Sequence, residues 1–167
     1  THPYAVQVTA QIRACCEKLD LPYRRIVRAE EGAGDWLRCA SLTDAARLCR
    51  ELTGNILLTT GSKELKAYSQ IKDFAERVYA RVLPLEDSLV LCREAGVKAA
   101  HILAMQGPFS EEMNTAMLRA IGAKWLVTKD GGAAGGFAEK AAAAAKTGVR
   151  LLVIGRPAEA DGIGLSE

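Results

Sequence analysis

Short apolar runs alternate with longer amphipathic segments along the chain from residue 55 onward. The runs begin at Ile56, Val78, Ala100, Trp125 and Leu151, so that successive starts lie 22 to 26 residues apart. Uninterrupted apolar runs of this length are typical of strands that are buried on both faces of a parallel sheet. The variable spacing and the dissimilar segments between the runs argue against a solenoid repeat.

Helical periodicity fills the stretches between the runs. It predicts helices over residues 43–52, 85–95, 111–121 and 137–146. Ser41 or Thr43 is the expected cap of the first of these helices, and Ser110 is the expected cap of the third. Residues 62–76 are less regular and predict a short helix with a loop. Strands alternating with helices in this way predict an α/β fold with a Rossmann-like, doubly wound parallel sheet.

The pattern also divides the chain into two parts. Residues 43–167 are expected to form a carboxyl-terminal Rossmann-like subdomain. Residues 1–42 are expected to be the tail of an amino-terminal subdomain and its linker. This tail contains an amphipathic helix predicted over residues 4–19, with Cys15 as a small buried side chain on its apolar face, and short strands near residues 23–28 and 36–40.

Composition and charge exclude several classes of protein. Hydrophobic residues make up 49% and charged residues 25% of the 167 positions, which excludes an intrinsically disordered chain. A net charge of only +2 argues against nucleic acid or an anionic membrane as a partner. We expect no membrane span and no signal peptide, because no apolar run is long enough. Because the chain opens at Thr1 without a methionine, we expect it to be a fragment.

Cysteine and histidine are arranged unfavourably for a disulfide framework or a metal site. The five cysteines are odd in number and contain no C-x-x-C, and the two histidines, His2 and His101, are too few for a multi-histidine centre. We therefore expect no metal. Reduced thiols favour a cytoplasmic location.

Candidate chemistry gathers at the residues that follow the apolar runs. Ligands of open α/β sheets bind beyond the carboxyl ends of the strands, and hydroxyls, glycines and cations occur there at residues 59–63, 106–110, 129–136 and 155–157. Backbone N–H groups at such positions can bind a phosphate or a carboxylate, and Lys63 and Lys129 add positive charge. Tight turns and a flexible loop explain the same glycines, and the two interpretations stay open. Neither G-x-x-x-x-G-K-[ST] nor G-x-G-x-x-G after a strand occurs, which excludes a P-loop nucleotidase.

Seven short segments, in the same order, resemble those of the precorrin-6A reductase family. They are residues 1–5, 21–24, 58–65, 81–84, 107–110, 128–132 and 153–157. The block Ala-Met-Gln-Gly-Pro-Phe-Ser-Glu-Glu-Met-Asn at 104–114 is most similar to the oxygen-independent branch, the cobalt-precorrin-6A reductases. The likeness spans nearly the whole chain, which corresponds to the carboxyl-terminal two-thirds of the family.

The resemblance implies an oxidoreductase of corrin (vitamin B12) biosynthesis with two Rossmann-like halves. In that family NADPH or NADH gives a hydride to a ring double bond of cobalt-precorrin-6A, and cobalt-precorrin-6B is formed. The implied cofactor-binding residues are Thr60, Gly61, Ser62, Lys63, Gln106, Gly107, Pro108, Phe109, Ser110, Lys129, Asp130 and Gly131. The implied contacts to the tetrapyrrole are Thr1, His2, Tyr4, Arg81 and Arg156. Lys129 and His2 are the candidate catalytic residues, with His2 as the candidate proton donor.

Two other functions remain compatible with the sequence. One is a transferase of the same architecture that acts on a phosphorylated or carboxylated metabolite, because a fold does not fix a function. The other is a truncated, non-catalytic module that binds a tetrapyrrole. The sequence does not distinguish NADH from NADPH, and it does not give the oligomeric state.

Overall fold

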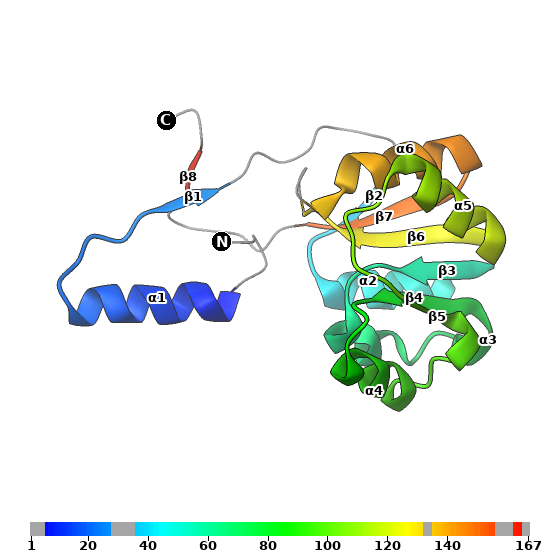
Figure 1. The fold of residues 1–167 in the computed structure, drawn as a ribbon, viewed down its shortest axis with the longest axis horizontal. Coiled ribbons are helices and arrows are strands. Elements are labelled where there is room, and N and C mark those ends of the chain that lie inside the picture. Colours follow the sequence, from blue (N-terminus) through cyan, green and yellow to red (C-terminus); the bar gives the residue numbers. More distant parts are fainter. Residues whose placement is uncertain (1–5, 28–35, 132–134, 156–161, 165–167) are drawn as a thin grey trace.

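A parallel six-stranded sheet dominates the computed structural model, which describes residues 6–27, 36–131, 135–155 and 162–164. The strand order is β2-β7-β6-β3-β4-β5, and every neighbouring pair is parallel (Figure 1). Its strands are β2 (Leu37–Cys39), β3 (Asn55–Leu58), β4 (Val78–Val82), β5 (Ile102–Ala104), β6 (Ala123–Lys129) and β7 (Arg150–Ile154). The sheet confirms the predicted α/β fold, and β3 to β7 confirm the five apolar runs.

Helices connect these strands. They are α2 (Leu42–Glu51), the 3-10 helix η1 (Ser62–Tyr68), α3 (Phe74–Arg77), α4 (Glu86–Glu94), the 3-10 turn η2 (Ala99–His101), α5 (Glu111–Ile121) and α6 (Phe137–Thr147). Ser41 caps α2 by accepting from the backbone N–H of Asp44, and Ser110 caps α5 by accepting from that of Met113. The predicted caps and helices are thereby confirmed.

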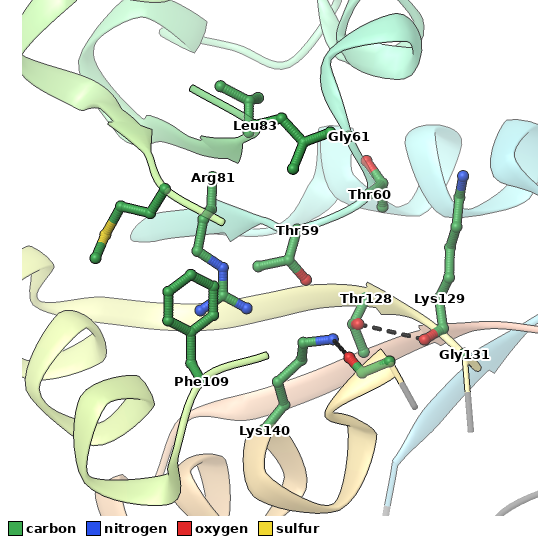
Figure 2. Close-up of a pocket in the computed structure, with 13 residues that line it drawn as sticks. Thr59, Thr60, Gly61, Arg81, Leu83, Phe109, Thr128, Lys129, Gly131 and Lys140 are labelled. Atoms are coloured by element: carbon green, nitrogen blue, oxygen red, sulfur yellow. Dashed lines mark hydrogen bonds between the residues drawn. The ribbon is translucent and has the colours of Figure 1, made fainter. Parts of the chain in front are cut away.

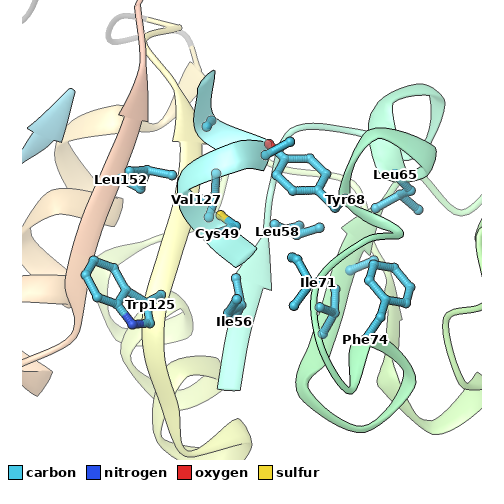
Figure 3. Close-up of a cluster of buried hydrophobic side chains, with 14 of the residues drawn as sticks. Cys49, Ile56, Leu58, Leu65, Tyr68, Ile71, Phe74, Trp125, Val127 and Leu152 are labelled. Carbon is cyan, nitrogen blue, oxygen red and sulfur yellow. The ribbon is translucent and has the colours of Figure 1, made fainter. Parts of the chain in front are cut away.

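One face of the sheet packs against α2, η1 and α4. Alternate residues of the central strands point to this side, including Ile56 and Leu58 of β3 and Val127 of β6. Figure 3 shows these side chains beside Cys49 of α2 and Tyr68 of η1, all of them buried. The residues between them point to the opposite face, so the strands are apolar on both sides, as a covered parallel sheet requires.

The opposite face packs against α5 and α6. Leu57 of β3 and Leu126 of β6 contribute to this second core, together with Leu118 of α5 and Phe137 of α6. The ring of Trp36 meets that of Phe137 edge to face, with 5.0 Å between the ring centroids. The pair of helices α5 and α6 therefore covers the side of the sheet toward which the odd-numbered residues of β3 and β4 point.

The remaining elements form a small separate unit. Strand β1 (Arg25–Val27) pairs in parallel with β8 (Gly162–Gly164), and Figure 1 shows both, with helix α1 (Val6–Lys18), apart from the six-stranded sheet. The helix is where the sequence predicted it. The prediction that Cys15 is buried is wrong, because the apolar face of α1 does not pack against the sheet and Cys15 is exposed, as are Val8 and Ile12. All five cysteines are free thiols.

Strand pairing crosses residue 42 in both directions. Strand β2 precedes this position and joins the large sheet, whereas β8 follows it and pairs with β1. The division into residues 1–42 and 43–167 stays a prediction. Within the described parts of the chain, no helix has the length and apolar character that crossing a bilayer requires.

Candidate functional site

A cavity of about 440 Å³ lies at the carboxyl ends of the central strands, where the strand order reverses between β3 and β6. From β3 the chain proceeds to β4 and β5 on one side and returns to β6 and β7 on the other, which is the arrangement in which open α/β sheets bind ligands. The lining residues are Thr59, Thr60, Gly61, Arg81, Val82, Leu83, Met105, Phe109, Thr128, Lys129, Gly131, Gly135 and Lys140 (Figure 2).

Strand β4 places Arg81 in this cavity. Val78, Ala80 and Val82 face the core on the side of α2 and α4, so the alternation turns Arg81 toward α5. The residue is 7% exposed, and its Nη1 donates to Oδ1 of Asn114 over 2.8 Å. Burial lowers the pKa of Arg81 to about 10, so the guanidinium remains charged at neutral pH.

The turn between β5 and α5 fixes the position of Arg81. The amide nitrogen of buried Asn114 donates to the carbonyl oxygens of Phe109 and Ser110, at 3.2 and 2.8 Å. Its oxygen accepts from Arg81, and the guanidinium carbon of Arg81 lies 4.5 Å from the centroid of the Phe109 ring. The buried side-chain amide of Asn114 thus connects the turn between β5 and α5 with Arg81.

Helix α6 supplies a second cation, Lys140. Its Nζ donates to the carbonyl oxygen of Gly135 over 2.7 Å. Burial, and next the positive charge of Arg81, lower the pKa of Lys140 to about 8. Lys140 and Arg81 also line a smaller adjoining cavity of about 210 Å³ with Gly107, Pro108 and other residues of the same loops.

Lys129, at the end of β6, pairs with an acid. Its Nζ lies 2.6 Å from Oε1 of Glu64, which η1 presents across the sheet edge. Both side chains are only partly exposed. Gly61 precedes η1 with φ +101°, a conformation that favours glycine, and it lines the cavity without a side chain.

The structure brings many of the sequence-predicted residues to this cavity. Those that line it are Thr60, Gly61, Arg81, Phe109, Lys129 and Gly131, and Gly107 and Pro108 line its smaller neighbour. The prediction that the turns after successive strands gather at one rim is confirmed for these positions. Which ligand they contact stays a prediction.

Other predicted residues lie beside the cavity without lining it. Ser62 donates to the hydroxyl of Ser88, and Lys63 and Gln106 are exposed. Ser110 is occupied as the cap of α5. Asp130 is fully buried, with Oδ2 at 3.8 Å from Nη1 of Arg38. Thr1, His2, Tyr4 and Arg156 lie outside the described residues.

Sequence reasoning assigned no role to Lys140, Asn114, Thr59 or Thr128. Lys140 stands in an alanine-rich helix, where a lysine is ordinarily a solvated surface residue. Asn114 stands in the first turns of α5, where nothing local indicates a partner 33 positions away. Thr59 was included in the segment 59–63 that follows the first apolar run and Thr128 in the segment 128–132, but neither was assigned a ligand contact. A prediction of which helices pack beside the carboxyl ends of the strands would have identified Lys140 and Asn114.

Comparisons with known proteins agree with this fold. The family model described as precorrin-6x reductase CbiJ/CobK matches residues 1–166. A cobalt-precorrin-6A reductase of Methanothermobacter thermautotrophicus is 35% identical over 160 residues, covering 94% of this chain and 53% of that protein. One of Salmonella typhimurium is 35% identical over 162 residues, covering 94% and 61%.

A solved structure described as CobK precorrin-6A reductase shares the fold, with a TM-score of 0.74 and 23% identity, over 98% of this chain and 65% of that one. The chain spans about half to three-fifths of the length of the curated relatives named above. The match of the family model over 166 residues is decisive for membership. The chain therefore belongs to the precorrin-6x reductase CbiJ/CobK family.

Proposed function

We propose that the chain is part of a cobalt-precorrin-6A reductase and takes part in the NAD(P)H-dependent reduction of one ring double bond of cobalt-precorrin-6A, which gives cobalt-precorrin-6B. Curated relatives at 31–35% identity are named cobalt-precorrin-6A reductase. The observation that carries the proposal within this chain is the cavity at the reversal of strand order, which Arg81, Lys129 and Lys140 line.

The cavity suits a small anionic ligand. Its volume of about 440 Å³ is within the range of small-molecule sites. Arg81, Lys129 and Lys140 are cations, whereas Val82, Leu83 and Phe109 supply apolar surface for a planar ring. Acetate and propionate groups of the tetrapyrrole and phosphates of the nucleotide both require cations and N–H donors.

The residues fit a nicotinamide nucleotide in two respects. Helix α6 begins after Gly136, which has no side chain to cap it, so its first N–H groups are available beside Gly135 and Lys140. Gly61 and Gly131 allow close approach of a ligand to the backbone. When bound, the nicotinamide supplies a hydride. In the proposal, the residues of this chain hold the ligand in place and exclude water from it, with Lys129 as the positioning cation anchored by Glu64.

The test is to mix the full-length protein that contains this chain with cobalt-precorrin-6A and either NADPH or NADH, and to follow absorbance of the reduced nicotinamide. We expect its consumption, and we expect Lys129→Met to lower kcat/KM about tenfold by loss of one charged contact. Lys146→Met is the control, because Lys146 lies on the outside of α6 and pairs with Glu111.

The other two functions give different results in the same experiment. A change in the tetrapyrrole spectrum without consumption of reduced nicotinamide would identify a binding module that does not turn over. Absence of both changes would refute the proposal and would leave a transferase on this architecture as the function to test. The contacts predicted for His2 and Arg156 are tested by the same assay with His2→Ala and Arg156→Ala.

A further inference from the structure

Two cations enter the cavity from neighbouring layers of the fold. Arg81 comes from the sheet and Lys140 from α6, and Figure 2 shows the charged ends of both directed into the same part of the cavity, near Thr59. They also line the adjoining smaller cavity together. Two like charges that meet in a partly desolvated space repel each other unless an anion lies between them.

Neither cation forms an ion pair with an acidic side chain of residues 6–27, 36–131, 135–155 and 162–164, although Glu139 acts on Lys140 from a distance. The ion pairs of this region use other groups, such as Lys129 with Glu64 and Lys146 with Glu111. Arg81 contacts an amide oxygen, a thioether and the face of Phe109, and Lys140 donates to the carbonyl oxygen of Gly135. These neutral acceptors hold the two side chains in position without neutralising their charge.

We propose that Arg81 and Lys140 together bind one anionic group, a phosphate or a carboxylate, of the ligand that occupies the cavity, and that Lys140 is thereby a specificity-determining residue. The identity of that ligand rests on the proposed function, but the anion site itself does not. The two side chains are already oriented by Asn114 and Gly135, so little conformational entropy is lost when the anion binds.

The protonation of Lys140 supports this assignment. Burial and the charge of Arg81 disfavour its ammonium form and lower its pKa to about 8. The charged groups around it are Arg81 on β4, Lys129 at the end of β6 and Glu139 on its own helix, which acts in the opposite direction. On the neighbouring α5, Glu111 pairs with Lys146. An anion between the two cations favours the ammonium form, so at pH 8, where Lys140 is about half protonated, binding raises its protonation.

The experiment is calorimetric titration of the 167-residue chain with two probes in phosphate-free buffer. Inorganic pyrophosphate represents the nucleotide, and uroporphyrin represents a tetrapyrrole with carboxylate side chains. We expect Lys140→Met to weaken binding of one probe about tenfold, Lys140→Arg to retain it within about threefold, and the same-helix control Lys146→Met to retain it within about twofold. Lys140→Met removes a buried charge rather than an apolar contact, so it is expected to fold.

Titration at pH 8 in two buffers of different ionisation enthalpy adds an independent readout. Because pyrophosphate itself exchanges protons near pH 8, the readout is the difference between the two proteins. The wild-type chain should take up about half a proton more on binding than Lys140→Met does. An effect on pyrophosphate alone assigns the site to a phosphate, and an effect on uroporphyrin alone assigns it to a carboxylate.

Three results would overturn the proposal. They are that neither probe binds the wild-type chain, that Lys140→Met binds both probes as the wild type does, or that Lys146→Met weakens binding equally. These measurements need no hydride transfer. Binding through Lys140 by this chain, with no consumption of reduced nicotinamide by the full-length protein, would therefore refute the proposed function and leave the anion site intact.

Discussion

The hydrogen bond between Arg81 and Asn114 gives the most direct test of how the site is held. Asn114 is 3% exposed and accepts from the guanidinium over 2.8 Å, so Asn114→Leu leaves a buried charge without this partner. A hydrogen bond to a charged group contributes about 1.5–3 kcal/mol, and Asn114 also loses its bonds to Phe109 and Ser110. We expect Asn114→Leu to lower the free energy of unfolding by about 3 kcal/mol.

A double-mutant cycle separates the pair from those other losses. The bonds to Phe109 and Ser110 disappear in both backgrounds that carry Asn114→Leu, so they cancel in the cycle. Arg81→Met removes the charge that would be left without a partner. The double variant should therefore be about 2 kcal/mol more stable than the sum of the two single effects, equivalent to about 4–8 °C in Tm for a chain of this size.

Urea unfolding, followed by circular dichroism and by fluorescence of Trp36 and Trp125, measures all four proteins of the cycle. Trp125 is buried in the core beneath α2, and Trp36 contacts Phe137 on the opposite face, so the two residues report on both layers. A coupling energy within about 0.5 kcal/mol of zero would refute the reasoning, since it would mean that Asn114 does not hold the cation.

Three further predictions concern protonation, packing and thiol reactivity. Lys140→Met should raise the free energy of unfolding by about 1 kcal/mol below pH 8, because the folded chain lowers the pKa of this lysine from 10.5 to about 8. The gain should vanish as the pH rises from 8 to 10.5, and urea unfolding that shows an equal gain at pH 7 and pH 11 would contradict it. Leu58→Ala, at a position that is 1% exposed, should cost about 3 kcal/mol by the same measurement, whereas the exposed control Leu89→Ala should change stability by less than about 0.5 kcal/mol. Burial raises the pKa of Cys49 to about 12, so a thiol reagent should label exposed Cys15 in the folded chain and Cys49 only on unfolding, and equal rates would be evidence against this structure.

The local pattern was sufficient to locate the elements. Strands β3 to β7 appear in the sequence as apolar runs, because most residues of a parallel sheet that is covered on both faces are buried and apolar, with Arg81 of β4 as an exception. Ser110 marks the start of α5, because the cap bond to Met113 spans only three positions. The incorrect prediction that Cys15 of α1 is buried also came from a local pattern. An apolar stripe shows that a helix can pack against another element, but not that it does.

The partners of the charged residues in the site could not be predicted from the local pattern, because they lie far away in the sequence. Lys129 meets Glu64 across 65 positions, and Arg81 meets Asn114 across 33. An isolated lysine in the sequence therefore gave no indication of whether it was paired. Lys140 was overlooked for the same reason. Helical periodicity shows which residues share a face of the helix, but not which part of the fold that face contacts.

The amino-acid sequence by itself determined the α/β class, the positions of the strands and helices, and which turns carry glycines, hydroxyls and cations. The tertiary structure alone decided the order β2-β7-β6-β3-β4-β5, and with it the reversal beside which these turns surround one cavity. It also decided which cations are paired and that Arg81 and Lys140 face each other. The physical reason is that hydrogen-bonded periodicity acts over a few residues, whereas strand order and the environment of a charge arise from packing between segments that are distant in the chain.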